Sequence, residues 1–523
     1  MKKIYLVAAL TSAILVAASC SDNLDIKQHG TLNYDTYYQT DEQYLSADAA
    51  MYSTYAGLEY NLMLCRNMLT DDFIAGGAQR GDNFDLENMN EFSFDAEESY
   101  IQSIFSTYYT VIYKANVILG HVPADGDATA QLVRAEAKVF RAWCYFDLIS
   151  QFGNPPIVDH ELAPSEYNVP NGSTEELWAL VEKDLTEAIE SGSLVSKTSI
   201  NDNTTWRVTK EFAEAILGKA YLWQNKYKEA AAEFDKVINS QLYRLAQDTD
   251  YAYGDLHRIP NKHNVESIFE SNRVYDSNNS YGNFTLFYLM INWRTDHMSG
   301  VSGTEVMDTG WGFQCPTKDL YDAFVKDEGV NGYRLNQTMK TYDQLKAMGI
   351  NVTSNILSYG YFMWKTRPVK ADRGYSSDFV YDANALWMRY AEVLLCAAEA
   401  NFRAGDTGKA LSQVNLIRKR AKLPDLTTLT LDDIKLEKRL ELCAEGQRYA
   451  DLVRYSAVDG KDDAYEALKD NGSVYPVMDA SGNVTLKPCN KTLYGFKKGK
   501  SELLPYPATE IRLNSAIKQN PGY

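Results

Sequence analysis

The chain is poor in the features that mark enzymes. Its six histidines show no metal-ligand spacing, and it has no Walker loop, HExxH, GxSxG or dinucleotide-binding fingerprint. Among 70 Asp and Glu residues some pair will always lie at glycosidase distance, so the carboxylates are no evidence for hydrolysis. Asp125-Gly126-Asp127 could contact calcium, but a turn between two helices is the favoured interpretation. The sequence therefore predicts no catalytic residues, no cofactor and no metal.

Cysteine pairs and positive charge are also scarce. The seven cysteines are scattered without a CxxC pair, and Cys144 and Cys396 lie in strong helical patterns, which predicts buried free thiols. Only 52 Lys and Arg face the 70 acidic residues, a formal charge of −18. This charge repels phosphate backbones and argues against nucleic acid as a partner. It also disfavours polyanionic glycans, unless one local basic patch overrides it.

The N-terminus has the form of a secretory signal. Lys2 and Lys3 precede an apolar run over residues 4–18, which is shorter than the about 20 residues of a membrane-spanning helix. The run ends in Val16-Ala17-Ala18-Ser19-Cys20, which resembles the lipobox of bacterial lipoproteins, except that leucine is more usual in place of Ala17. Residues 1–19 are predicted to be a signal peptide and Cys20 to be lipidated. A plain secreted protein, in which Cys20 is incidental, is the alternative.

A lipidated Cys20 would hold the chain at a membrane permanently, because each buried CH₂ contributes about 0.8 kcal/mol. Residues 20–40 are predicted to be a polar tether, and Asp22 and Asp25 resemble the acidic tether of surface-exposed lipoproteins. Removal of residues 1–19 takes away Lys2 and Lys3, which changes the formal charge from −18 to −20.

Helical periodicity dominates three parts of the remaining chain, in which apolar residues recur at spacings of three and four. These parts are about residues 41–70, 100–240 and 381–456. Pro155-Pro156 ends one helix. Ser173 or Thr174, followed by Glu176, predicts an N-cap for a helix that runs through about Ile189. The chain is therefore predicted to be mainly α-helical.

Two stretches show the spacing of the tetratricopeptide repeat, in which small residues let two antiparallel helices approach and large residues fill the groove between them. The first, residues 210–238, contains Leu217, Gly218, Tyr221, Ala230 and Phe234. The second, residues 391–418, repeats the spacing with Ala398, Ala410, Val414 and Ile417. Recurring helix pairs predict a helical-repeat scaffold with long insertions.

The largest insertion is about residues 240–380. It is rich in Gly, Asn, Asp, Tyr and Trp, and its hydrophobic periodicity is weak, which is typical of turns and loops. A smaller region at about residues 71–99 has the same character. Loop regions of this length within a compact protein are usually functional.

Three stretches together resemble the SusD/RagB family of outer-membrane glycan-binding lipoproteins of Bacteroides-type bacteria. The first is AEAKVFRAWCYFDL at residues 135–148, closing in FGNPP at 152–156. The second comprises RYAEVLL at 389–395, AEA at 398–400, NLIR at 415–418, EKRLEL at 437–442, EGQRY at 445–449 and DLVR at 451–454. The third is LLPYP at 503–507, Glu510-Ile511 and NPGY at 520–523.

The resemblance implies a single domain over residues 41–523, with about four tetratricopeptide-like helix pairs supporting an irregular, loop-rich lobe. It implies a partner, a TonB-dependent transporter barrel similar to SusC on which this protein sits as a lid, and no enzymatic activity. The C-terminal motifs are implied to be structural: Glu441, Glu445, Arg448 and Arg454 are expected to form ion pairs between helices rather than to contact ligand.

The resemblance places the ligand residues in the loop after the second helix and in the large insertion. The first region offers Asp72, Arg80, Asn83, Phe84 and Phe94; the second offers Tyr281, Tyr288, Trp293 and Trp311. Aromatic rings suit sugars because they cover the apolar C–H faces, and the chain is rich in tyrosine, with 37 residues. Core packing is the alternative for each ring. Trp293 and Trp311 are the preferred stacking platform, because no helical stripe requires them as core.

The sequence therefore predicts cell-surface binding of a glycan and its delivery to the transporter. A peptide-binding lid of the same fold is the first alternative, since a scaffold does not dictate its cargo. A glycoside hydrolase on a helical scaffold is the second. Binding to glycan and peptide panels separates the first two, and turnover of a bound oligosaccharide would favour the third.

Overall fold

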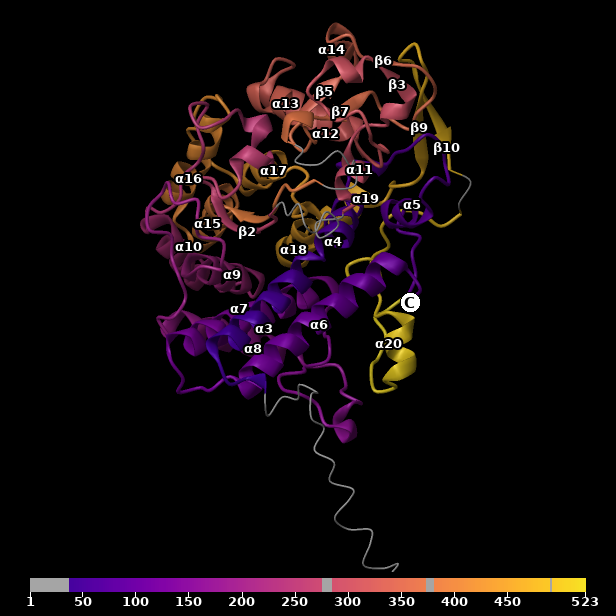
Figure 1. Ribbon diagram of the computed structural model, residues 1–523. Coiled ribbons are helices and arrows are strands. Elements are labelled where there is room, and N and C mark those ends of the chain that lie inside the picture. The colour runs from indigo at the N-terminus through magenta and orange to yellow at the C-terminus, as the bar shows by residue number, and fades with distance from the viewer. Residues whose placement is uncertain (1–36, 275–284, 373–380, 490–491) are drawn as a thin grey trace, which may run out of the picture.

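The computed structural model describes residues 37–274, 285–372, 381–489 and 492–523, and it is mainly helical with small sheets (Figure 1). The predicted signal peptide, Cys20 and most of the tether lie outside the described residues, as does Tyr281. Within the described part of the chain, no helix is both long and apolar enough to cross a membrane.

The helical scaffold is formed by the N-terminal half of the chain and a later C-terminal part. Its helices are α3 (Asp41–Ala56), α4 (Glu59–Met68), α6 (Ser99–His121), α7 (Ala128–Phe152), α8 (Thr174–Glu190), α9 (Lys210–Trp223), α10 (Tyr227–Asn239), α15 (Tyr390–Ala404), α16 (Thr407–Arg420), α17 (Leu431–Glu441) and α18 (Arg448–Asp459). The shorter helices α5 (Phe84–Asn90), α19 (Asp463–Leu468) and α20 (Ala508–Leu513) lie outside it.

Local capping explains where several of these helices begin. The Ser173 side chain accepts a hydrogen bond from the Glu176 amide, and the Glu176 carboxylate accepts one from the Ser173 amide, which confirms the predicted N-cap of α8. Asp127 caps α7 through a 3.0 Å bond from the Ala130 amide, so Asp125-Gly126-Asp127 is the turn between helices that was predicted. The α7 helix ends at Phe152, before the two prolines.

Successive helices pack side by side, so that α6, α7, α8, α9 and α10 form a continuous stack (Figure 1). The small residue predicted to allow close approach does so: a Cβ on Gly218 would lie 2.8 Å from the Phe234 ring of α10. The stack then continues from α10 to α15 and α16, although about 150 residues separate α10 from α15 in sequence. Ala398, Ala410 and Val414 form a separate apolar cluster there.

The insertion between α10 and α15 is more regular than predicted. It contains the helices α11 (Phe287–Ile291), α12 (Lys318–Glu328), α13 (Tyr333–Thr338) and α14 (Tyr342–Ala347). Its strands are β2 (Ser267–Ser271), β3 (Met298–Ser299), β4 (Gln314–Pro316), β5 (Met339–Thr341), β6 (Asn351–Val352) and β7 (Tyr361–Met363). The remaining strands are β1 (Phe73–Ala75), β8 (Ala385–Arg389), β9 (Val474–Met478) and β10 (Val484–Pro488).

These strands pair only in twos, all antiparallel: β1 with β4, β2 with β8, β3 with β6, β5 with β7 and β9 with β10. The β2–β8 pair fastens the start of the insertion to the strand that leads into α15. The insertion also has an apolar cluster of its own, which includes Trp293, Val306, Leu345, Ile350 and Phe362. It is therefore a packed lobe, drawn at the top of Figure 1, rather than a set of loops.

The C-terminal motifs form the predicted ion pairs. Fully buried Arg389 lies 2.7 Å from carboxylate oxygens of both Glu441 and Glu445, and 3.0 Å from Glu266. Burial alone would raise the pKa of Glu445, but Arg389 and Lys365 outweigh it and hold that pKa at about 2. This cluster joins the scaffold, the insertion and the C-terminal motif at one buried point.

Two further motif arginines make the same kind of connection. Arg454 of α18 lies 2.6 Å from Glu399 of α15, and Arg448 lies 2.9 Å from Asp71, just after α4. Burial alone would raise the pKa of Asp71, but the neighbouring arginines outweigh it and lower that pKa to about 2. All four residues expected to form ion pairs therefore do so, and each of them pairs with a residue of an element far away in sequence.

Candidate functional site

The two regions expected to supply ligand residues lie side by side. Strand β1, from the loop after α4, pairs with β4 of the insertion, in the register Phe73 to Pro316. Beyond the strands, the Gly77 amide donates to the Gly312 carbonyl at 2.8 Å. A Cβ on Gly76 would lie 2.1 Å from the same carbonyl, so only glycine permits this approach of the two backbones.

Phe84 is the most exposed aromatic residue of this region. It is the first residue of α5, and 66% of its surface is exposed. Asn83 caps the helix by accepting a 3.0 Å hydrogen bond from the Leu86 amide, so its side-chain oxygen is used locally. The ring lies over Gly81, whose φ of +90° is favourable only for glycine. The turn before α5 therefore holds an apolar ring in an outward position.

Arg80 lies at the edge of the same turn and is anchored by charge. Its guanidinium is 2.5 Å from Glu91 and 3.1 Å from Glu87, both of which are buried. It also lies 5.4 Å from the centre of the Tyr475 ring of β9. A quarter of the side chain remains exposed, so a planar, positively charged group is held at the surface near Phe84.

Trp311 lies in the insertion, just before β4. Its ring is half-buried against the main core, and its backbone amide donates to Leu289 at 2.7 Å. Its carbonyl accepts from Arg294 at 3.4 Å, and Arg294 lies 3.9 Å from Asp82, two residues before Phe84. The Trp311 backbone is thus linked through Arg294 to the turn that precedes α5.

Trp293, the other predicted platform, is a core residue. Only 4% of its surface is exposed, and its indole N–H donates to the Met363 carbonyl at 2.9 Å. Its ring packs edge-on against Phe362 at 5.8 Å within the apolar cluster of the insertion. The prediction that no core requires Trp293 is therefore wrong.

Three more predicted ligand residues are buried with protein partners. The Tyr288 ring packs on Tyr381 at 4.5 Å, and Phe94 stacks on Tyr523 at 6.1 Å. Asp72 accepts from Arg439 at 2.7 Å, and 2% of its surface is exposed. These positions are buried in the described structure and do not present an open face to a ligand, which corrects the prediction for Tyr288, Phe94 and Asp72. Arg80, Asn83, Phe84 and Trp311 stay predictions, as does Tyr281, which lies outside the described residues.

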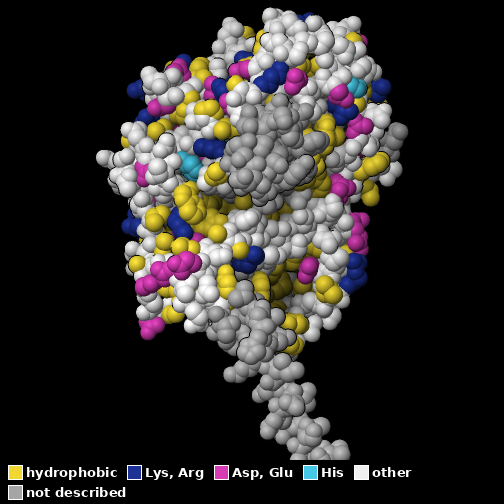
Figure 2. All heavy atoms as spheres, in the orientation of Figure 1, with side chains coloured by type: hydrophobic (Ala, Val, Ile, Leu, Met, Phe, Trp, Pro, Cys, Tyr) yellow, Lys and Arg dark blue, Asp and Glu magenta, His cyan; other side chains and the backbone are white. Residues whose placement is uncertain are grey.

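The structure also shows a surface cleft that sequence reasoning missed. The face in Figure 2 is hollowed across its middle, where hydrophobic side chains gather. Among the described residues, Tyr60, Arg273 and Leu286 help to line a cleft of about 240 Å³, whose Arg273 pairs with Glu59 at 2.6 Å. Tyr60 lies on α4, within the region predicted to be helical scaffold, and no local sequence pattern indicated that its side chain lines a cleft.

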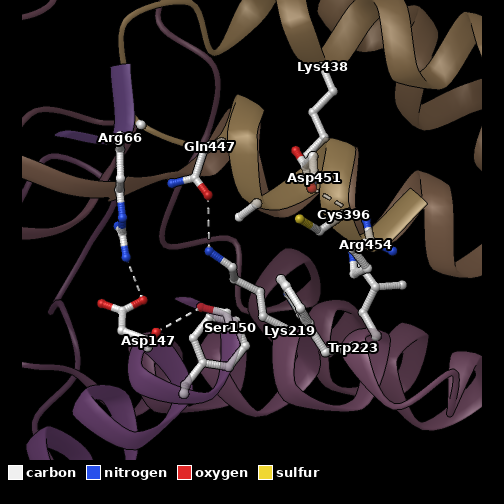
Figure 3. Close-up of a pocket in the computed structure, with 14 residues that line it drawn as sticks. Arg66, Asp147, Ser150, Lys219, Trp223, Cys396, Lys438, Gln447, Asp451 and Arg454 are labelled. Carbon is white, nitrogen blue, oxygen red and sulfur yellow. Dashed lines mark hydrogen bonds and ion pairs between the residues drawn. The ribbon is translucent and has the colours of Figure 1, made fainter. Parts of the chain in front are cut away.

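A second cavity lies between α7, α9 and α18 and is lined by charged groups (Figure 3). Arg66 pairs with Asp147 at 2.7 Å, and Lys438 pairs with Asp451 at 2.8 Å. Its volume of about 30 Å³ holds one or two water molecules, far less than a sugar ring needs. This cavity is therefore too small to be a ligand site.

The carboxyl group of Glu98, which is close to Asp85 of α5, has a raised pKa. Glu98 precedes α6 and is only 7% exposed. Burial, and secondarily the charge of Asp85, raise its pKa to about 7. Among the described residues, no group of three or more His, Cys, Asp or Glu side chains is arranged to hold a metal ion.

The chain matches two family models over most of its length. The model described as "SusD family" matches residues 262–523, and the one described as "Starch-binding associating with outer membrane" matches residues 35–222. Among curated relatives, "SusD-like protein P38" of Formosa agariphila is 24% identical, over 87% of this chain and 91% of its own length.

Solved structures share the fold. A "Laminarin binding SusD-like protein" is 28% identical with a TM-score of 0.78, over 93% of this chain and all of that one. The structure of "Surface glycan-binding protein A from Bacteroides thetaiotaomicron in complex with laminarihexaose" is 23% identical with a TM-score of 0.73, over 92% of this chain and all of that one. Together with the helical stack, the buried motif network and the family models, these matches show that the chain belongs to the SusD family.

Proposed function

We propose that the chain binds a glycan at the cell surface, without cleaving it, and passes it to a TonB-dependent transporter barrel. The observation that carries the proposal is the exposed Phe84 ring, which belongs to the loop region that the β1–β4 pair joins to the insertion. A 28% identical structural neighbour described as laminarin binding supports a glycan as the cargo. A β-glucan is therefore the first ligand to test.

The chemistry of this surface suits a sugar. An exposed phenyl ring can cover the apolar C–H face of a pyranose, and the neighbouring guanidinium can donate to ring hydroxyls. Covering the ring contributes about 2 kcal/mol by apolar-area reckoning, which corresponds to roughly thirtyfold in affinity. Because the Phe84 ring is exposed, we expect its removal to weaken ligand binding and to leave the stability of the fold nearly unchanged.

Calorimetric titration with laminarihexaose tests the site. We expect Phe84→Ala to weaken binding at least tenfold while the melting temperature changes by no more than about 2 °C. Trp311→Ala should weaken binding similarly, with a larger loss of stability because its ring is half-buried. Tyr167→Ala is the matched control, since that ring is 60% exposed in a different segment of the chain.

Equal affinity of Phe84→Ala, Tyr167→Ala and the parent protein would remove Phe84 from the site. If the parent binds no laminarihexaose but binds other members of a panel of oligosaccharides, the site remains and the cargo changes. Binding to peptides alone would favour the peptide-binding lid. Release of shorter oligosaccharides from a bound ligand, followed by chromatography, would instead favour a hydrolase.

The delivery step rests on the family and on the predicted anchor at Cys20. We propose that lipidation at Cys20 holds the protein on the outer face of the outer membrane, where it forms a complex with a barrel similar to SusC. Purification from outer membranes in mild detergent should recover a large barrel protein together with this chain. Recovery of the chain alone, under conditions that preserve other such complexes, would contradict the partnership.

A further inference from the structure

A second cleft lies far along the chain from the β1–β4 region, between the segment after α10, helix α13 and the C-terminal end of α16. Its volume is about 260 Å³, a little below the roughly 300–1,000 Å³ of small-molecule pockets. The cleft therefore has room for one sugar ring or a molecule of similar size.

Three tyrosine side chains form much of the cleft. Tyr253 is buried and its hydroxyl donates to the Glu441 carbonyl at 2.9 Å. The Tyr251 hydroxyl donates to Asn264 at 2.9 Å, and that of Tyr333 donates to Asp248. With the three hydroxyl groups engaged by protein, the rings are fixed in place as walls of the cleft.

Positive charge gathers around these rings. The lining residues are Lys419, Arg420 and Lys422 against the single carboxylate of Asp248. Arg420 is buried and pairs with Glu441 as well as with Glu266, at 2.8 Å, and Lys422 pairs with Asp248 at 2.5 Å. Lys419 is exposed, and no ion pair engages it within the described residues. On a chain of formal charge −18, this is a local basic patch with one free ammonium group.

The backbone conformation at Lys422 is unusual for a lysine at the rim of the cleft. Lys422 follows the end of α16 with a φ of +62°, a left-handed conformation in which glycine is the favoured residue. Its ammonium group nevertheless lies 3.7 Å from the centre of the Tyr333 ring. The side chain is thereby held over the cleft although the backbone position is costly for lysine.

We propose that this cleft is a second ligand site, which binds an acidic sugar unit through its carboxylate or sulfate group. Lys419 supplies the free positive charge, Lys422 the second cation at the rim, and the tyrosine rings flank the sugar. Such a site would let an acidic protein select a charged unit or branch of a glycan, separately from the surface around Phe84.

Titration of the purified protein with D-glucuronic acid, D-glucose 6-sulfate and D-glucose tests the proposal, with chemical shifts or heat as the signal. We expect at least one acidic sugar to bind about tenfold more tightly than glucose, since one charge-assisted hydrogen bond accounts for about that factor. The preference between the two acids identifies the anionic group. Binding should weaken as sodium chloride is raised.

Lys419→Gln should reduce the affinity for the acidic sugar about tenfold. Lys228→Gln is the matched control, because Lys228 is an exposed lysine on α10 that does not line the cleft. Phe84→Ala should leave this affinity unchanged, which separates the two sites. Equal binding of glucose and both acids, no binding of either acid, or equal effects of Lys419→Gln and Lys228→Gln would each overturn the proposal.

Discussion

Glu445→Gln tests whether the buried ion pairs around Arg389 stabilise the contact between the helical scaffold and the insertion. The Glu445 carboxylate lies 2.7 Å from the Nε atom of Arg389 and also pairs with Lys365, and both cations are fully buried. The glutamine is nearly isosteric but carries no charge. In the variant, Arg389 and Lys365 both lose the charge of Glu445. Arg389 keeps Glu441 and Glu266 as partners.

The expected loss of stability is about 3–5 kcal/mol, the usual cost of breaking a buried ion pair by removing one partner. The lowered pKa of Glu445 points in the same direction. Its pKa falls from 4.5 to about 2, and a shift of that size corresponds to roughly 3 kcal/mol. Since the folded pKa is lowered, this stability is present above pH 4.5 and is lost as pH falls toward 2.

Urea unfolding of the parent and variant at pH 7 and pH 3 measures both effects. The variant should be less stable at pH 7, and the difference should shrink at pH 3. Lys365→Met combined with Glu445→Gln should recover part of the loss, because the unpaired cation is then removed as well. Glu97→Gln is the control, since the Glu97–Arg512 pair is largely exposed and should contribute less than about 1 kcal/mol. A Glu445→Gln variant as stable as Glu97→Gln would refute the reasoning.

Three further outcomes are expected. Trp293→Ala should cost about 3–5 kcal/mol of stability and leave laminarihexaose affinity within about twofold, so an unchanged melting temperature would contradict its core position. The pKa of Glu98 is raised to about 7 in the folded protein, so the parent should lose stability as the pH rises from 4.5 to 7. In urea unfolding, Glu98→Gln should remove this part of the pH dependence. Cys20→Ala should release the protein into soluble fractions; membrane association that persists in high salt would count against lipidation.

Helix boundaries could be predicted because their causes are local. The Ser173–Glu176 capping box lies within four residues, and it starts α8 where the sequence indicated. The Gly218–Phe234 contact also followed from sequence, since the repeat spacing fixes which small residue faces which large one. The continuation of the stack from α10 to α15 did not follow from periodicity, because no local pattern reports a contact across about 150 residues.

Helix α12 could have been predicted from the sequence, although the insertion as a whole has the composition of loops. Leu320 and Phe324 are buried, and Tyr321, Ala323 and Val325 pack partly buried against the main core, which gives a short apolar stripe at helical spacing. Thr317 caps the helix by accepting a bond from the Leu320 amide. The stripe covers only this one helix, and no such pattern reports the strand pairs that make the rest of the insertion a packed lobe.

The contrast between Trp293 and Phe84 shows the limit of composition as a guide to sites. Trp293 was expected to stack on a ligand because it lies in a polar, glycine-rich insertion without a helical stripe, yet its neighbour Asn292 is itself buried and donates to the Met307 and Thr309 carbonyls at 3.0 and 2.9 Å. A polar neighbour therefore indicates exposure only when its hydrogen bonds go to water, and sequence does not reveal where they go. Phe84 follows a helix cap, whose geometry fixes the side chain's direction locally.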